Sequence, residues 1–363
     1  FEWSQNGFQE DIFTYIYKKL LRLSAHKLYE RFISVIKFVR KPLKKIIVIA
    51  THFSIAHQLV MIRHDLEHKL GCKLYIFVQV TDDSPQNIWY VPGADLIFAP
   101  SKFTKEALQR YGKRVNLEKT KIIVTPYPIS NKLLLKLSDH KFERRLNQYN
   151  SEFVDEIDIL IPVSGAAVGM KYFEKFTLTL FKYSNQFRIS YVLKNTINTQ
   201  FFIDKLKKVD GVFVNSHKRD TKVIEDYENE LKNKVYGFEM TKPSEQAFKA
   251  LISPNQVGGV ILLFTNPVGR QEYDNLNFLK RHLLIPSDED QKTLWRMPKT
   301  NDILKKAITW RGLRLPKNPE KSVNFLIWCI KNKIFEQMGK YTNGVRSDGV
   351  KRFWEEVIFA VKD

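Results

Sequence analysis

The stretch "KIIVIATHF", Lys45–Phe53, is the segment from which the fold class follows. It contains an unbroken apolar run, which is typical of strands that are buried on both faces, as the strands of parallel sheets are. Apolar residues then recur at helical spacing from Ile55 to Leu70. A buried strand that leads directly into a helix is the building block of α/β proteins.

The same alternation continues along the chain in two series. The first runs through "KLYIFVQVTDD", "DLIFAPS", "TKEALQRYG" and "KIIVTPYPIS" and ends near Pro128. The second begins with "DILIPVSGAAVGM" at Asp158 and continues through "RISYVLKN", "GVFVNSH", "KVYGFEM" and "GGVILLF". Between them, "DHKFERRLNQYNSEF" has no strand pattern and is interpreted as a connection. Strands that alternate with helices predict parallel sheets covered by helices, and hence two Rossmann-like domains in tandem.

The length of the chain supports this organisation, because 363 residues of which 44% are hydrophobic can form two cores. We predict an N-terminal domain over 1–130, a connection over 131–155, a second domain over 156–287 and a helical tail over 288–363. The tail is rich in tryptophan. Phe1 is not an initiator methionine, so we expect further residues upstream of it.

The composition restricts the partners. Lys and Arg outnumber Asp and Glu by 59 to 39, a formal charge of +20, which indicates an anionic partner such as a nucleic acid, a lipid surface or a phosphorylated ligand. The basic residues are dispersed and match no nucleic-acid-binding motif, so no nucleic acid is expected. No run approaches the roughly 18 apolar residues that span a bilayer. Cys72 and Cys329 fit neither a zinc site nor a local disulfide, which favours buried thiols in the cytoplasm.

Residues 12–40 form a basic amphipathic segment. Up to Lys45 the chain has ten Lys and Arg against four Asp and Glu. One interpretation is attachment to an anionic membrane surface, which attracts basic side chains near the headgroups. The other is a pair of ordinary helices whose charged face is solvated. The apolar residues at helical spacing are Ile16, Leu20, Leu23, Phe32, Ile36 and Val39.

Two turns of the second series are candidate anion sites. In "PVSGAAVGMKYFEKF", Gly165 and Gly169 allow backbone N–H groups to approach an anion at the start of a helix, although glycines also let a strand and a helix pack closely. In "TKPSEQAF", Thr241–Phe248, Ser244 is placed as the N-cap of a helix. That helix start is either simply capped or a second anion-binding site.

The stretch "RQEYDNLNFL", Arg270–Leu279, follows the last buried strand of this series. Gln271 and Asn275 are four residues apart, so both amides lie on one face of a helix. Amides and carboxylates suit sugar hydroxyls, because they offer donors and acceptors without a charged partner. The alternative is a solvated first helical turn.

Histidines and an aspartate in the first series are candidate catalytic or metal-binding groups. His64 and His68 have a metal-like spacing, but we expect them, together with His57, to face solvent, and we predict no metal site. His52 and Asp82 each follow a strand, where a side chain can serve as a base or as an acceptor contact.

In their order, these segments resemble the GT-B glycosyltransferases of the group that contains monogalactosyldiacylglycerol synthase and the lipid-linked N-acetylglucosaminyltransferase of peptidoglycan synthesis. The resemblance covers about residues 10–285. It rests on "IVIATHF", "VTDDSPQNIWYVPGADLIFAPS" and "IIVTPYPIS" in the first half and on "VSGAAVG", "YVLKN", "TKPSE" and "GRQEYDNLNFL" in the second.

The resemblance implies a transferase at the inner face of the membrane that moves a sugar from a nucleotide sugar, a UDP-sugar, to a lipid or envelope acceptor. The nucleotide sugar is a co-substrate, and no other cofactor is implied. Helix dipoles and amides would stabilise the departing diphosphate. His52 and Asp82 are the catalytic candidates. The donor-binding residues implied are Ser164, Gly165, Gly169, Thr241, Lys242, Ser244, Gln271, Glu272 and Asn275.

The sequence also departs from this group. The group's first strand and glycine-rich loop, with a histidine, would precede residue 1. Ser244, Glu245 and Gln246 stand where the group has a small glycine-rich turn, and a carboxylate beside a diphosphate is repulsive. The group's ribose-binding glutamate falls on Ala250. The alternative function is therefore that of a non-catalytic GT-B-like protein that binds a ligand or a partner.

Overall fold

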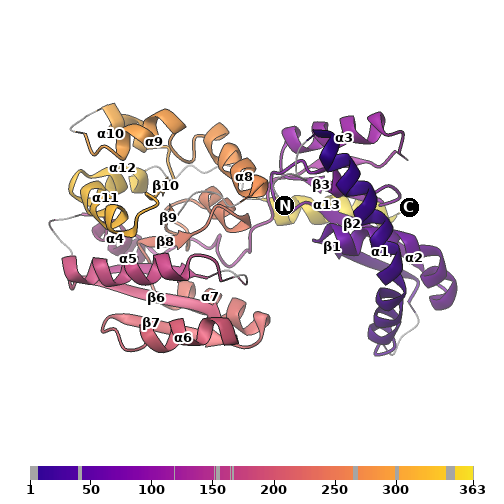
Figure 1. Ribbon diagram of the computed structural model, residues 1–363, viewed down its shortest axis with the longest axis horizontal. Helices are drawn as coiled ribbons and strands as arrows, with labels where there is room; N and C mark the ends of the chain where they lie inside the picture. The colour runs from indigo at the N-terminus through magenta and orange to yellow at the C-terminus, as the bar shows by residue number, and fades with distance from the viewer. Residues whose placement is uncertain are drawn as a thin grey trace. The chain divides into compact units, whose positions relative to one another are not determined.

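The chain forms two compact units in the computed structural model (Figure 1). Unit 1 consists of Phe1–Pro128, Gly269–Asp274 and Asp348–Asp363, and unit 2 of Ile129–Val268 and Asn275–Ser347. The structure describes residues 7–39, 43–117, 119–150, 152, 156–163, 165, 167–264, 269–298, 302–340 and 348–362.

Unit 1 contains a four-stranded parallel sheet in the order β1-β2-β3-β4. The apolar run that follows Lys45 forms β1, in which Ile46 lies opposite Leu74 of β2. The strands are β1 (Lys45–Ala50), β2 (Lys73–Gln79), β3 (Leu96–Ala99) and β4 (Ile122–Val124), and the helices are α1 (Gly7–Ile36), α2 (Phe53–Leu70), η2 (Asn87–Trp89), α3 (Lys102–Arg114) and α13 (Gly349–Lys362).

Helices cover both faces of this sheet. Side chains alternate along each strand, so each strand contributes to a core on either face. Leu74 and Ile76 of β2 pack in one core with Leu66 of α2. Phe77 and Phe98 pack in another with Phe353 of α13, the end of the predicted helical tail. The ring centroids of Phe98 and Phe353 are 4.3 Å apart. The tail therefore completes the core of unit 1.

Residues 12–36 lie in the single helix α1 of 30 residues instead of a pair of helices. Its inward face includes Leu21, Ala25 and Ile33, all buried. Ile16, Leu20 and other apolar residues of the predicted pattern are exposed. Of the helices that the structure describes, none has the length and apolarity needed to cross a bilayer.

Unit 2 contains a six-stranded parallel sheet in the order β10-β9-β8-β5-β6-β7. Numbered from the first strand of the unit, this is the doubly wound order 3-2-1-4-5-6. The predicted α/β architecture is confirmed. The strands are β5 (Ile157–Pro162), β6 (Phe187–Lys194), β7 (Val212–His217), β8 (Phe238–Thr241), β9 (Val260–Leu263) and β10 (Gly312–Arg314).

The tail contributes β10 to this sheet, so it is not purely helical as predicted. Three residues are too few to show the alternation that identifies a strand. The helices of unit 2 are α4 (Asp139–Asn147), α5 (Met170–Tyr183), α6 (Ile197–Leu206), α7 (Asp220–Asn233), η3 (Glu245–Leu251), α9 (Asp288–Leu294), α10 (Asp302–Ala307), α11 (Pro319–Lys331) and α12 (Ile334–Lys340), while α8 (Arg270–Arg281) begins in unit 1 and continues in unit 2.

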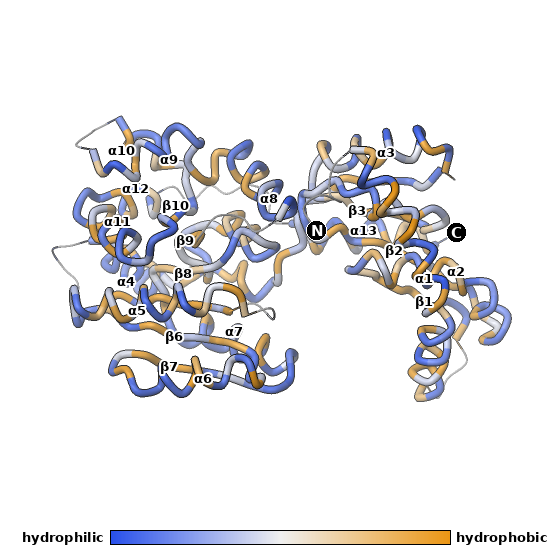
Figure 2. The backbone as a smooth tube through the Cα atoms, in the orientation of Figure 1, coloured by the Kyte–Doolittle hydropathy of each residue, from blue (hydrophilic) through white to orange (hydrophobic). Residues whose placement is uncertain are grey.

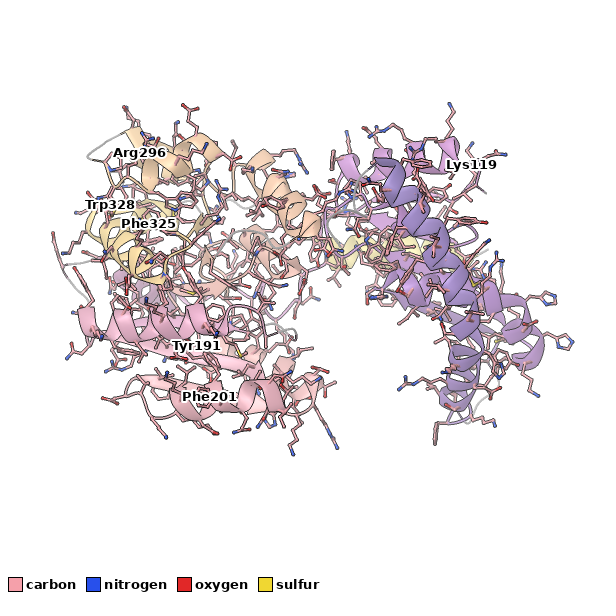
Figure 3. All side chains as sticks on the ribbon, viewed as in Figure 1. Lys119, Tyr191, Phe201, Arg296, Phe325 and Trp328 are labelled. Atoms are coloured by element: carbon pink, nitrogen blue, oxygen red, sulfur yellow. The ribbon has the colours of Figure 1, made fainter. Side chains whose placement is uncertain are left out.

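One large core joins α5, α6, α11 and α12 to the strands of unit 2. Tyr191 of β6 lies within it, fully buried (Figure 3), and its hydroxyl is 2.7 Å from Thr177 Oγ1 of α5. Because the hydroxyl has a partner, this polar atom is tolerated in an apolar core.

The segment interpreted as a connection contains α4, and α4 carries the fully buried Arg145. The Arg145 guanidinium donates hydrogen bonds to the carbonyl oxygens of Tyr236 (3.0 Å) and Val257 (2.6 Å). It also donates to Pro254 (2.7 Å) and Gly258 (2.6 Å) and to Gln256. A buried charge is costly unless its donors are used, and here they hold the segment that leads into β9.

The change Arg145→Ala should lower the free energy of unfolding by about 3 kcal/mol or more, because it leaves a cavity and several buried carbonyls without donors. The neighbouring Arg144→Ala is the control, because its side chain is 53% exposed and lies 3.9 Å from the buried Asp158 carboxylate. Asp158 keeps the nearer Lys234, at 2.7 Å, so this change should cost about 1 kcal/mol. Urea titration followed by tryptophan fluorescence measures both. Equal losses would contradict the role assigned to Arg145.

The expectation that His57 faces solvent is wrong, whereas His64 and His68 are exposed. His57 is 5% exposed, and its Nε2 donates to the carbonyl of Ile88 at 2.9 Å. This side of α2 is covered by η2 (Asn87–Trp89), which the spacing of apolar residues in α2 does not indicate. Burial, followed by the positive charge of Lys18, lowers the pKa of His57 to about 4.

His57 should make unit 1 sensitive to acid. Its pKa is about 4 in the folded protein against 6.5 ordinarily. Its contribution to the free energy of unfolding is therefore complete above pH 6.5 and is lost as the pH falls towards 4. The loss should be about 3 kcal/mol, because the unfolded chain binds a proton that the folded chain does not. Urea titrations at several pH values across this range should show that the free energy of unfolding depends less steeply on pH in His57→Gln than in the wild type. The exposed His64→Gln should match the wild type. An unchanged pH dependence of the free energy of unfolding in His57→Gln would contradict the assignment.

Candidate functional site

The strand order of unit 2 brings two loops together at one edge of its sheet. β5 lies between β6 and β8. The chain leaves β5 towards β6 and leaves β8 towards β9, so the loops after the paired strands β5 and β8 run in opposite directions. Doubly wound proteins bind ligands outside the carboxyl ends of such a strand pair. The described residues at this edge that the sequence predicted as donor-binding are Gly165, Gly169, Thr241, Lys242 and Ser244.

The loop after β5 contains two glycines with different structural explanations. Gly169 has φ +91°, and a Cβ there would overlap the ring of Phe264, so packing alone requires glycine. Gly165 is exposed with open space around an added Cβ, so packing does not explain it. Ser164 lies outside the described residues. Gly169 is also the N-cap of α5 and leaves the first amides of that helix without a side-chain cap.

The turn after β8 contains a buried hydroxyl without a protein partner. Ser244 stands at the N-cap position of η3, but its side chain accepts no capping hydrogen bond, so the predicted capping role is wrong. Ser244 is 4% exposed, and its Oγ has no hydrogen-bond partner among the residues that the structure describes. Thr241 Oγ1 instead donates to Gln246 Oε1. A buried hydroxyl without a partner costs about 1–3 kcal/mol, and a ligand that accepts from it would remove that cost.

Three polar residues that the sequence analysis did not select support this turn: the buried Glu239 and the partly buried Lys249 and Tyr227. Glu239 precedes Thr241 by two residues, on the same face of β8. It forms an ion pair with Lys249 of η3 and accepts from the Tyr227 hydroxyl at 2.9 Å. Lys249 Nζ also donates to that hydroxyl at 3.1 Å. A carboxylate inside the buried strand "FEMT" is the sequence signal that a cation must lie nearby.

Burial governs the ionisation of this cluster. It lowers the pKa of Lys249 to about 7. It also raises the pKa of the Tyr227 hydroxyl above its ordinary value. The tyrosine therefore stays protonated and remains a donor to Glu239.

Asn275 connects α8 to the same turn. It is 1% exposed, and its Nδ2 lies 3.5 Å from the carbonyl oxygen of Pro243. The residue that the resemblance assigns to holding a helix start therefore contacts the turn that contains Ser244. The half-buried Lys242 lies in this turn as well.

The first turn of α8 groups with unit 1 rather than with unit 2. Arg270 donates to Glu10 of α1 at 2.8 Å. Asp274 accepts from the Ser84 hydroxyl, also at 2.8 Å. Polar residues of this turn are thus engaged by the segments of unit 1 around residues 10 and 84.

Gln271 and Glu272 belong to this turn, so the predicted donor-binding residues are divided between the two units. Gln271 Nε2 donates to Gln86 Oε1 at 3.3 Å, and Glu272 is 8% exposed. Gln271 and Asn275 both lie in the one helix α8, as the helical spacing predicted, although they group with different units. That Gln271 and Glu272 contact a sugar stays a prediction.

The catalytic candidates lie at the carboxyl ends of two paired strands of unit 1. His52 follows β1 and is exposed, and its Nδ1 accepts from the Ser54 amide at 3.2 Å, which caps α2. Asp82 follows β2 and is 8% exposed. The adjacent Asp83 is fully buried and accepts from the Thr104 hydroxyl at 2.8 Å. The catalytic roles of His52 and Asp82 stay predictions.

Two cavities of unit 2 involve other residues. One, of about 450 Å³, is lined by four lysines, Glu228 and an apolar floor that includes Leu231 and Val257. The other, of about 720 Å³, is lined by Trp295, Lys317 and neighbouring residues. Neither contains a predicted site residue. Within the described parts of the chain, no group of three His, Cys, Asp or Glu side chains is arranged to hold a metal ion.

Comparison with solved structures identifies the fold. No family model and no curated protein matches the sequence. A putative UDP-N-acetylglucosamine 2-epimerase from Listeria monocytogenes is similar in structure, with 12% identity, a TM-score of 0.51, and coverage of 93% of this chain and 79% of that one. A second structure of a UDP-N-acetylglucosamine 2-epimerase gives 12% identity, a TM-score of 0.51, and coverage of 93% and 78%. The predicted fold class, two Rossmann-like domains of GT-B type, is confirmed, and the C-terminal tail is mostly helical apart from β10.

Proposed function

We propose that unit 2 binds the nucleotide and diphosphate of a UDP-sugar and that the protein is a glycosyltransferase acting on a lipid or envelope hydroxyl. The observation that carries the proposal is the Ser244 hydroxyl at the carboxyl end of β8, which is buried and has no hydrogen-bond partner among the described residues. This is the place where a doubly wound sheet offers a ligand site.

The surroundings of Ser244 suit a diphosphate. The N-terminus of α5 carries uncapped amides and the positive end of the helix dipole, both of which favour an anion. Gly165 leaves open space beside this loop, and Lys242 supplies a cation to the turn. Glu245 is exposed rather than buried in the turn, which weakens the repulsion that its sequence position suggests.

The proposed reaction follows from these positions. An acceptor hydroxyl attacks the anomeric carbon of the donor sugar, the bond from that carbon to the diphosphate oxygen breaks, and UDP leaves with the negative charge. The α5 dipole and the Ser244 hydroxyl stabilise that charge. A base, for which His52 and Asp82 are the candidates, accepts the proton of the acceptor hydroxyl.

Two further observations support the choice of donor and acceptor. The two structures of similar fold are named as a UDP-N-acetylglucosamine 2-epimerase and a putative one, which favours a uridine nucleotide here. The formal charge of +20 favours an acceptor held at an anionic surface, such as a lipid at the inner face of the membrane.

A second candidate function is ligand binding without sugar transfer, by a GT-B-like protein. It is favoured by polar groups that were predicted to be catalytic or donor-binding but that form hydrogen bonds within the protein. His52 Nδ1 caps α2, and the Gln271 amide donates to Gln86. Such a protein would bind UDP-sugar at unit 2 and transfer nothing.

Isothermal titration of the full-length protein with UDP and UDP-sugars tests the proposal. We expect Ser244→Ala to weaken UDP binding about tenfold or more, because hydrogen bonds to charged groups contribute about 1.5–3 kcal/mol. The same change should leave the free energy of unfolding unchanged or slightly higher, since the hydroxyl loses no protein partner.

Ser322→Ala is the matched control. Ser322 is fully buried in α11, and its hydroxyl donates to Pro316 O at 2.8 Å. This variant should lose about 1 kcal/mol of stability and keep its UDP affinity. Absence of UDP and UDP-sugar binding to the wild type would refute the proposed site. Binding without release of UDP in the presence of membrane lipids would favour the second candidate.

A further inference from the structure

The helix α1 exposes a row of apolar side chains on the face opposite to the one that packs against the rest of unit 1. Leu21, Ala25 and Ile33 define the packed face. The row has a spacing of three or four residues, which places its members on one side of the helix. Its members, called here the outward row, are Phe8 (76% exposed), Ile12 (39%), Ile16 (51%), Leu20 (55%) and Leu23 (81%).

This arrangement differs from that of an ordinary surface helix, which is polar on its solvent face. Figure 2 shows hydrophobic and hydrophilic residues alternating along the whole of α1. An exposed apolar surface that spans several helical turns marks an interaction site more often than scattered single residues do. The next question is which partner its surroundings fit.

The acidic residues of this part of α1 are directed away from the outward row. Glu10 accepts from the Asn87 amide at 2.6 Å and pairs with Arg270 at 2.8 Å. Asp11 pairs with Arg114 at 2.8 Å. Neither carboxylate is left to repel an anionic partner.

The basic residues on and beside the outward row, unlike these acidic residues, are exposed and are not in ion pairs among the described residues. Lys19, Arg22 and Lys27 are exposed, and none has a carboxylate within ion-pair distance among the described residues. Lys18, by contrast, points inward and lies 3.4 Å from the Tyr90 carbonyl. The outward face of α1 therefore combines apolar side chains with unpaired cations.

We propose that this face docks the protein on a bilayer that contains anionic phospholipid, with the outward row at the boundary between headgroups and acyl chains and with Lys19, Arg22 and Lys27 against lipid phosphates. Exposed apolar residues flanked by Lys and Arg suit the boundary between headgroups and acyl chains. Each basic residue near the surface contributes about 1 kcal/mol, and long basic side chains extend along the apolar layer to reach the phosphates. The proposal is independent of sugar transfer.

Co-sedimentation of the full-length protein with vesicles tests it. The wild type should bind vesicles of phosphatidylcholine mixed with phosphatidylglycerol, and bind much less to phosphatidylcholine alone. Ile16→Glu combined with Leu23→Glu should weaken binding at least about tenfold, because both charges would enter the headgroup boundary. Lys19→Glu combined with Lys27→Glu should abolish the preference for phosphatidylglycerol and its dependence on salt.

The helix α13 offers a matched control in the same unit. Ile358 (53% exposed) and Phe359 (66%) are similarly exposed apolar residues. Ile358→Glu combined with Phe359→Glu should leave vesicle binding unchanged. All these positions are already in water, so circular dichroism should report intact folding, and UDP titration of the α1 variants should match the wild type.

Two results would overturn the proposal. One is equal vesicle binding by the wild type and the Ile16→Glu, Leu23→Glu variant, or no binding by either. The other is a wild-type dimer in analytical ultracentrifugation that this variant converts to a monomer, without any affinity of the wild type for lipid. That result would assign the outward row to a second copy of the chain.

Discussion

The position of β5 between β6 and β8 is the constraint on which the candidate site depends. Because all strands of this sheet are parallel, the chain must leave β5 and β8 at the same edge and in opposite directions. The glycine loop and the Ser244 turn therefore lie at the same edge of the sheet, although about 80 residues separate them in sequence. A different strand order would separate them and remove the case for a nucleotide site.

Buried polar contacts then fix the turns that the strand order brings together. The Glu239–Lys249 pair holds η3 against β8, and Asn275 contacts the carbonyl of Pro243. Arg145 holds the segment that leads into β9. With these polar groups paired, the Ser244 hydroxyl is the buried group of this turn that has no hydrogen-bond partner among the described residues, and we seek its partner in a ligand.

The sequence predicted the features that local patterns encode. Apolar runs identified β1 and β5, and the order of motifs predicted the GT-B fold. It did not reveal β10, which is too short for a pattern, or the burial of His57, which depends on η2. Nor did it reveal that Arg145 has its partners more than 90 residues away. Residue types show which groups need partners, but only the tertiary structure shows which groups have found them, as Ser244 illustrates.

The most direct test of the nucleotide site is hydrogen–deuterium exchange of the full-length protein with and without UDP. Amides that bind a diphosphate should exchange more slowly. The account predicts that slowing is concentrated in the first turn of α5 and in residues 241–248 of the turn after β8. UDP binding that protects other segments and leaves these two unchanged would contradict it.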